Sequence, residues 1–199
     1  HEDLLKEFVD EDHIVIGTTE DNGAVLGMGH VRRGGTGVTN VGMLVEDKEG
    51  FLPQLKEAFD QCGFNVKIHE NIQTLIWDKL FTNVSLSALT GVLQVDMGYI
   101  AANEYAWDLC CQLIHETVKT AAAAGLDFDE EKVREKVKNT YINNPKGCTS
   151  IRADLRDGRK TEVDTISGAV VRAAHKHGVE VPGHECIVRL VHAMEGRNK

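Results

Sequence analysis

Apolar residues follow two different periods along the chain, and the change between them lies near residue 69. Before it, they come in short β-branched runs separated by glycines, a pattern typical of strands. Residues 13–18 predict a buried strand and residues 65–68 one more strand, while helical spacing occurs at residues 3–9 and 51–61. Antiparallel hairpins are expected from three further strand-like pieces, at residues 24–28, 29–33 and 37–45. This part is therefore predicted to be an α/β segment.

From residue 70 onward, apolar residues recur at the three- and four-residue intervals of amphipathic helices. Gly158 and Gly178 are expected to act as C-terminal caps. The pattern predicts two domains, residues 1–69 and residues 70–199. Helices are expected in the second at residues 70–90, 99–124, 129–141, 149–157, 162–177 and 184–195.

The helix expected at residues 70–90 carries polar side chains within an apolar stripe. At about 100° per residue, Lys79, Asn83 and Ser87 share a face with apolar residues, and a second apolar stripe lies nearly opposite, so the helix is predicted to be central. In one interpretation the three form a polar track along a cleft. In the other, Lys79 reaches the surface, Asn83 bonds to a loop and Ser87 bonds back to its own helix. Solvent positions on this helix are left to Thr74, Asp78, Thr82 and Ser85.

A second polar cluster occupies residues 148–164. Ser150 and Asp154 lie one turn apart on a short predicted helix, and Glu162 falls in the first turn of the next, on the face of Ile166, so its side chain is expected to point toward the core. Structural roles also explain these residues, because a carboxylate at a helix N-terminus complements the dipole and a serine there acts as a cap.

Composition narrows the class of protein. The net charge of -9 without a basic run argues against nucleic-acid and anionic-membrane partners. Five dispersed cysteines without a CxxC pair are typical of reduced thiols, and no apolar run approaches the roughly 18 residues of a membrane span. A soluble cytoplasmic protein is predicted. Because the chain starts at His1 directly on a helical pattern, we expect upstream residues to be missing.

The glycine-rich stretch at residues 34–42 does not predict a nucleotide site. Gly35 and Gly37 match the first two glycines of a GxGxxG loop, but Asn40 takes the third place and no helix follows to bind a pyrophosphate. A hairpin turn is expected instead.

No metal site is predicted. His115-Glu116 and His184-Glu185 each lack the second histidine of an HExxH motif, and no cysteine or carboxylate spacing supports zinc. Four other histidines could in principle meet around a metal, but we expect them at the surface: His175, His177, His184 and His192.

Residues 71–94 followed by residues 150–182 resemble the ketopantoate reductase (2-dehydropantoate 2-reductase) family. Residues 1–69 are similar to the family's last Rossmann strands. The resemblance implies an α/β remnant of a Rossmann-like NADP-binding domain, followed by an all-α helical domain of the 6-phosphogluconate dehydrogenase C-terminal-like type. That second domain would bind substrate and form the dimer.

The family implies NADPH-dependent reduction of ketopantoate, a small 2-keto acid, to pantoate for pantothenate and coenzyme A biosynthesis. By the resemblance, Lys79 corresponds to the general acid and Glu162 to a second catalytic carboxylate. Asn83 and Ser150 correspond to substrate contacts, and Asp154 to a motif aspartate. The resemblance also implies that NADP(H) is bound mainly by an N-terminal GxGxxG part that this chain lacks.

One departure from the family pattern concerns the substrate. Ser87 stands where the family usually has a second asparagine, so another 2-keto acid is an alternative. A further hypothesis makes the chain a non-catalytic dimerisation unit. Its helix at residues 99–124 would then pack across a two-fold axis through Trp107, Leu109, Leu113 and Val118.

Overall fold

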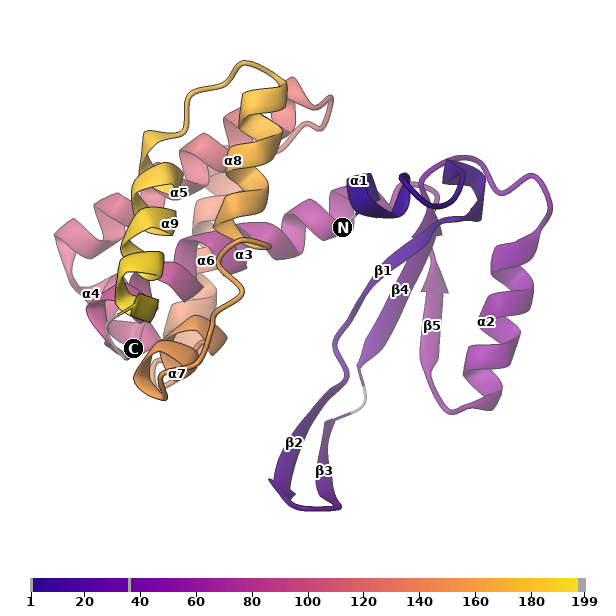
Figure 1. Ribbon diagram of the computed structural model, residues 1–199, viewed down its shortest axis with the longest axis horizontal. Coiled ribbons are helices and arrows are strands. Elements are labelled where there is room, and N and C mark those ends of the chain that lie inside the picture. The colour runs from indigo at the N-terminus through magenta and orange to yellow at the C-terminus, as the bar shows by residue number, and fades with distance from the viewer. Residues whose placement is uncertain (1, 36, 197–199) are drawn as a thin grey trace. The chain divides into compact units, whose positions relative to one another are not determined.

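The computed structural model describes residues 2–35 and 37–196 (Figure 1). The chain forms two compact units, residues 1–76 and 77–199, and the division falls inside helix α3 (Ile72–Leu93). Among the described residues, no helix combines the length and apolar character that crossing a membrane requires. All five cysteines are free thiols.

The first unit contains a three-stranded sheet and a separate two-stranded one, and the predicted strands are confirmed. In the larger sheet, β1 (Val15–Thr19) pairs antiparallel with β4 (Val38–Met43), which pairs in parallel with β5 (Asn65–Ile68). The smaller sheet is the predicted antiparallel hairpin of β2 (Asn22–Gly27) and β3 (His30–Gly35).

The glycine-rich stretch at residues 34–42 connects the two sheets and is not a hairpin turn. It contains the end of β3 and most of β4, while Thr36 lies outside the described residues. The two strands pair with different partners, β3 with β2 in the smaller sheet and β4 with β1 in the larger one. The chain therefore passes from one sheet to the other between β3 and β4, as it does between β1 and β2. Gly37 permits the crossing, since a Cβ there would lie 2.3 Å from Glu20 Cβ.

Helices of the first unit are α1 (Glu2–Leu5) and α2 (Phe51–Gln61), with a 3-10 turn at Glu11–His13. Asp47 starts α2 by accepting hydrogen bonds from the backbone N–H groups of the first two helical residues. Among the apolar residues of α2, Leu52 is buried in a small cluster with Val41 of β4 and Val66 of β5, whereas Ala58 and Phe59 are exposed.

The second unit is helical throughout its regular structure. Besides α3, its helices are α4 (Met97–Ala102), α5 (Glu104–Ala123), α6 (Glu130–Asn143), α7 (Ser150–Arg156), α8 (Ser167–Lys176) and α9 (Pro182–Glu195). The single helix predicted at residues 99–124 is wrong. The chain breaks at Asn103, which adopts an extended backbone and caps α5 by accepting a hydrogen bond from the Ala106 N–H. Gly158 and Gly178 have the positive φ of the predicted caps.

Helix α3 is central to this unit, as predicted, because every residue from 84 to 91 is buried. Ser85, expected at the surface, is fully buried and donates its hydroxyl to the Phe81 carbonyl oxygen at 2.6 Å. This part of α3 is enclosed on all sides and has no face toward solvent. The hydrogen bond to the preceding turn of the helix therefore gives the buried Ser85 hydroxyl its partner. Leu113, predicted for a dimer surface, is 2% exposed and packs in the core of its own chain.

Candidate active site

Lys79, Asn83 and Ser87 occupy successive turns of α3 and differ in exposure. Lys79 is exposed, Asn83 is half-buried and Ser87 is buried. The apolar stripe that contains Lys79 does not bury it, because α3 is enclosed on all sides only over residues 84–91. The polar track of the sequence therefore runs from the surface at Lys79 into the core at Ser87.

Thr149 joins the buried end of this track to helix α7. Its hydroxyl lies 2.7 Å from the Thr90 hydroxyl and 3.4 Å from the Ser87 carbonyl oxygen, both on α3. Thr149 is also the N-cap of α7, accepting a hydrogen bond from the Arg152 N–H. The structure thereby brings Ser150, the first residue of α7, next to a residue that contacts Ser87.

Sequence reasoning missed Thr149. A threonine directly before an apolar helix is a cap signal, but Ser150 offers the same signal one position later. Ser150 is in fact an exposed helical residue, so its hydroxyl is not the cap. The contact with α3 has no local sequence signature, because it joins segments far apart in the chain.

Asp154 accepts hydrogen bonds from Arg159 in the turn that follows α7. Its carboxylate accepts a hydrogen bond from Arg159 Nε at 2.8 Å, and its carbonyl oxygen accepts one from the Arg159 N–H at 2.7 Å. The side-chain bond to Asp154 is the largest cause that raises the pKa of the Arg159 guanidinium, and a side-chain bond to Asp157 adds to the rise. The structure therefore pairs Asp154 with Arg159 and shows it closing the turn.

Glu162 is exposed and lies in a turn, so its predicted orientation toward the core is wrong. Helix α8 begins at Ser167, later than predicted, and the helical-wheel face assigned to Glu162 does not exist there. Its neighbours Thr161 and Val163 are buried instead. Val163 belongs to the same core cluster as Phe81 of α3, so the Glu162 turn and α3 border one core.

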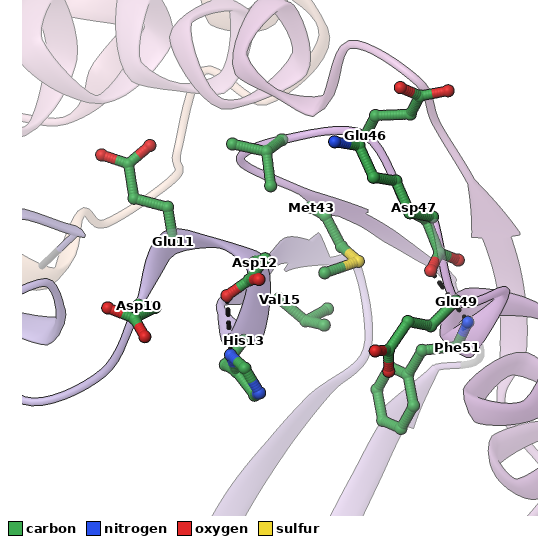
Figure 2. A pocket seen from close by; sticks show the side chains of 12 residues that line it. Asp10, Glu11, Asp12, His13, Val15, Met43, Glu46, Asp47, Glu49 and Phe51 are labelled. Carbon is green, nitrogen blue, oxygen red and sulfur yellow. Dashed lines mark hydrogen bonds and ion pairs between the residues drawn. The ribbon is translucent and has the colours of Figure 1, made fainter.

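The first unit has an acidic cavity of about 700 Å³ that contains none of the predicted site residues (Figure 2). Asp47 lines it and accepts hydrogen bonds from the N–H groups of Phe51 (2.9 Å) and Leu52 (2.8 Å), so the N-terminus of α2 is already occupied. A phosphate would be repelled by the carboxylates that line the cavity, those of Asp10, Glu11, Asp12, Glu46, Asp47 and Glu49. These residues do not fit a nucleotide's phosphates.

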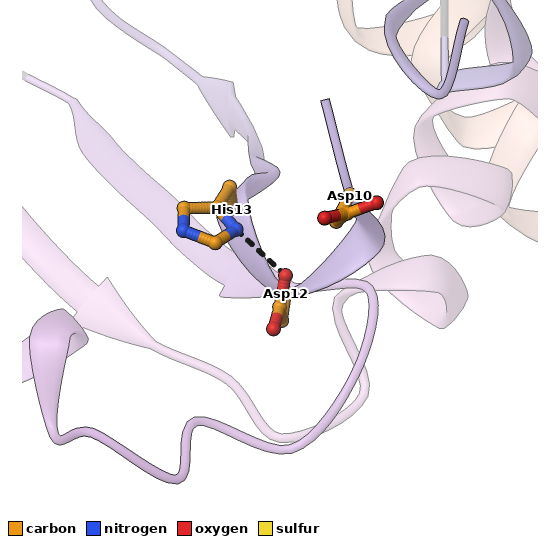
Figure 3. A group of neighbouring side chains, drawn as sticks. All are labelled: Asp10, Asp12 and His13. Atoms are coloured by element: carbon orange, nitrogen blue, oxygen red, sulfur yellow. Dashed lines mark hydrogen bonds and ion pairs between the residues drawn. The ribbon is translucent and has the colours of Figure 1, made fainter. Parts of the chain in front are cut away.

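At one side of this cavity, Asp10, Asp12 and His13 bring possible ligand atoms within 4.8 Å of one another (Figure 3). All three residues are exposed, and His13 Nδ1 is hydrogen-bonded to Asp12 Oδ1 at 2.7 Å. An exposed acidic group of this kind does not by itself make a metal site.

The histidines predicted at the surface do not form a cluster of metal ligands. His175 and His177 are exposed as predicted and His192 is half-buried, but His184 is completely buried. Its surface assignment is wrong, because His184 Nε2 bonds into α5 at Thr117 Oγ1 (2.9 Å), a contact that only the packing of α9 on α5 creates.

Comparison with known proteins supports the resemblance to the ketopantoate reductase family. The family described as "Ketopantoate reductase PanE/ApbA C terminal" matches residues 71–195, which include every predicted site residue. A 2-dehydropantoate 2-reductase of Streptococcus pyogenes serotype M6 is 28% identical over 196 residues, or 98% of this chain. The chain spans 64% of the length of that relative.

Solved structures share the fold. A D-mandelate dehydrogenase in complex with NADH superimposes with a TM-score of 0.91 at 27% identity, covering 100% of this chain and 68% of the other. A dimeric ketopantoate reductase from Staphylococcus aureus gives a TM-score of 0.83 at 21% identity, covering 97% and 66%, a likeness of fold alone. Because the matched family region makes up more than half of the sequence, this chain belongs to the ketopantoate reductase family.

Proposed function

We propose that the complete protein is a nicotinamide-dependent reductase that converts ketopantoate to pantoate, with NADPH as the reductant, in pantothenate and coenzyme A biosynthesis. The observation that carries the proposal is the Thr149 junction. Thr149 contacts α3 at the buried end of the track that begins at Lys79, and the exposed Ser150 follows it directly in the chain, inside the region that matches the family. In this proposal residues 1–69 are the C-terminal part of the nucleotide-binding domain, and residues 70–199 bind substrate.

Lys79 is proposed as the general acid. A reduced nicotinamide, when bound, would supply the hydride that the ketone carbon accepts, and negative charge would develop on the ketone oxygen. The lysine ammonium stabilises that oxygen and donates the proton that completes the hydroxyl group. Its exposed position on α3 leaves the side chain accessible to a substrate.

The other residues are proposed to orient the substrate. Asn83 and Ser150 offer neutral hydrogen-bonding groups for the carboxylate and hydroxyl ends, and Ser87 offers a shorter one than the family's asparagine. Glu162 would accept a hydrogen bond from the substrate hydroxyl or from Lys79. Asp154 remains part of the proposed site, with its carboxylate shared with Arg159.

Another 2-keto acid is the alternative substrate. Ser87 in place of an amide favours it, and so does the 27% identity to a structure of D-mandelate dehydrogenase with NADH. Turnover of ketopantoate and of the 2-keto acid corresponding to mandelate, each with NADPH and NADH, separates the candidates. We expect ketopantoate with NADPH to be preferred by at least about tenfold in kcat/KM.

Reversed preference in that assay would contradict the substrate or cofactor assignment, and no turnover of either acid would contradict the reductase proposal itself. We further propose that the protein works in the cytoplasm, which its free thiols support.

A homodimer through α5 is also proposed. Tyr105 and Leu109 are 73% and 49% exposed and lie one helical turn apart, so they present an apolar face to solvent. Leu109→Glu should convert a dimer into a monomer in sedimentation experiments, because a charge would be buried at the interface. Val25→Glu, at an exposed position of β2, is the matched control and should remain dimeric. A monomeric wild-type protein at micromolar concentration would contradict the proposal.

A further inference from the structure

Helix α9 anchors the turn that carries Glu162 at both ends. Thr161 donates its backbone N–H and its hydroxyl to Glu195 Oε1, each at 2.7 Å. At the other end, Asp164 Oδ1 lies 3.0 Å from His192 Nε2, and His192 Nδ1 lies 2.9 Å from Glu195 Oε2. A continuous chain of hydrogen bonds therefore links the residue before Glu162 to a residue shortly after it, through two side chains of α9.

This chain of bonds holds the backbone on both sides of Glu162. Thr161 and Val163 are 6% and 0% exposed, so their side chains hold the backbone on either side of the exposed Glu162 against the core. Thr161 also accepts a hydrogen bond from the Val163 N–H at 3.3 Å. The short turn that carries Glu162 is thus held from the α9 side.

The geometry is that of a protonated histidine. Each ring nitrogen of His192 faces a carboxylate oxygen, and only the imidazolium form carries hydrogen on both nitrogens. The hydrogen bond to Glu195 raises the pKa of His192 above its usual value, against the opposing effect of burial, and Asp164 adds to the rise. Burial raises the pKa of Glu195, but hydrogen bonds from Thr161 and His192 outweigh it and lower that pKa overall.

Other charged side chains lie near α9 and the Glu162 turn. Arg172 Nη1, on α8, and Asp164 Oδ1 both border Gly168, where an added Cβ would lie 3.4 Å from the first and 3.6 Å from the second. On α5, Glu116 bonds to the opposite, N-terminal end of α9, at the Gly183 N–H.

We propose that His192 and Glu195 form a clamp that positions Glu162, and that the clamp holds only while His192 carries its second proton. The imidazolium joins the carboxylates at the two ends of the turn, and its neutral form releases one of them. The inference rests on the proposed function, because His192 and Glu195 matter to the reaction only if Glu162 has its proposed role there. Both act through Glu162, so they are positioning residues.

A double-mutant cycle in the complete protein tests the clamp through the rate of 2-keto acid reduction. We expect His192→Gln to lower kcat by about 10- to 100-fold at a pH of about 6, as a misplaced catalytic group would. Adding it to Glu162→Gln should cause no further loss. His175→Gln is the control, since this exposed histidine of α8 also bonds to a carboxylate, that of Glu185 at 2.9 Å, and should leave kcat unchanged.

The pH profile separates positioning from a general structural role. The ratio of wild-type to His192→Gln kcat should fall toward one as the pH rises above the raised pKa of His192, because wild-type His192 then becomes neutral too. In Glu195→Gln, kcat should depend less on pH over the same range. The amide of Gln can accept hydrogen bonds from Thr161 and donate one to the neutral imidazole of His192.

The outcomes are distinguishable. If Glu162→Gln retains full turnover, the role of Glu162 in the proposed function is wrong, and the clamp fails with it. If Glu162→Gln is impaired, the clamp alone is overturned by any of three results: wild-type kcat in His192→Gln, multiplying losses in the double variant, or a rate ratio independent of pH.

Discussion

At the scale of single residues, His184 is completely buried, and its surroundings favour the neutral form of the imidazole. Its Nε2 lies 3.0 Å from the Leu113 carbonyl oxygen, which can only accept, so Nε2 carries the hydrogen. Its Nδ1 is buried and has no hydrogen-bond partner within the described part of the chain. Burial lowers the pKa of His184, although the bond to Leu113 and the charge of Glu116 oppose the shift.

Lowering the pH should therefore destabilise the protein through His184. The unfolded chain binds this proton with an ordinary pKa of about 6.5, while the folded protein resists it, so the free energy of unfolding falls as the pH drops below that value. In urea unfolding followed by circular dichroism, His184→Gln should flatten the decline between a pH of about 7 and 5. The exposed His177→Gln should keep the wild-type slope. Equal slopes for wild type and His184→Gln would contradict this account.

Spacing and the family resemblance were sufficient to identify Lys79, Asn83 and Ser150 as candidates, but not to describe their surroundings. A helical wheel assigns faces without knowing what packs on each, so it did not show that Lys79 is exposed. Thr149 and Glu195 were not predicted because their partners lie far away in the sequence.

At the scale of elements, the positions of strands and helices were predicted better than their ends. The two errors at helix ends, at Asn103 and Glu162, have a common cause: the hydrophobic period continues through a break that hydrogen bonds create. At Asn103 the side chain caps α5, and before α8 the Thr161 hydroxyl and the Glu162 carbonyl oxygen accept backbone N–H bonds within a turn. Periodicity does not detect such local competition for backbone groups.

The α3–α7 junction gives a prediction at this scale. Thr149→Val keeps the shape of the side chain but removes the hydroxyl that caps α7 and contacts Thr90, so the free energy of unfolding should fall by about 1–2 kcal/mol. Thr149→Ser retains the hydroxyl and is the control. Urea unfolding at constant pH measures both. A Thr149→Val variant as stable as the wild type would show that the junction contributes nothing.

At the scale of the whole molecule, the described residues include the proposed substrate site, but neither of the two places considered for a nucleotide fits a phosphate. The glycine-rich stretch lies mainly in β3 and β4, and the cavity of the first unit is acidic. A protein comprising only residues 1–199 should therefore bind NADPH no more tightly than a Kd of about 1 mM, a loss of roughly 4 kcal/mol relative to micromolar binding. Fluorescence titration checks this expectation, and micromolar binding would contradict it.

Lys79 is the residue on which the proposed reductase most depends. The most direct test is therefore kcat for the 2-keto acid that the complete protein reduces best, measured for Lys79→Ala and for Lys119→Ala, an exposed lysine of α5. We expect Lys79→Ala to lower kcat by about 100- to 10,000-fold, the contribution of a general acid, and Lys119→Ala to retain the wild-type rate. A Lys79→Ala variant with wild-type kcat would contradict this expectation.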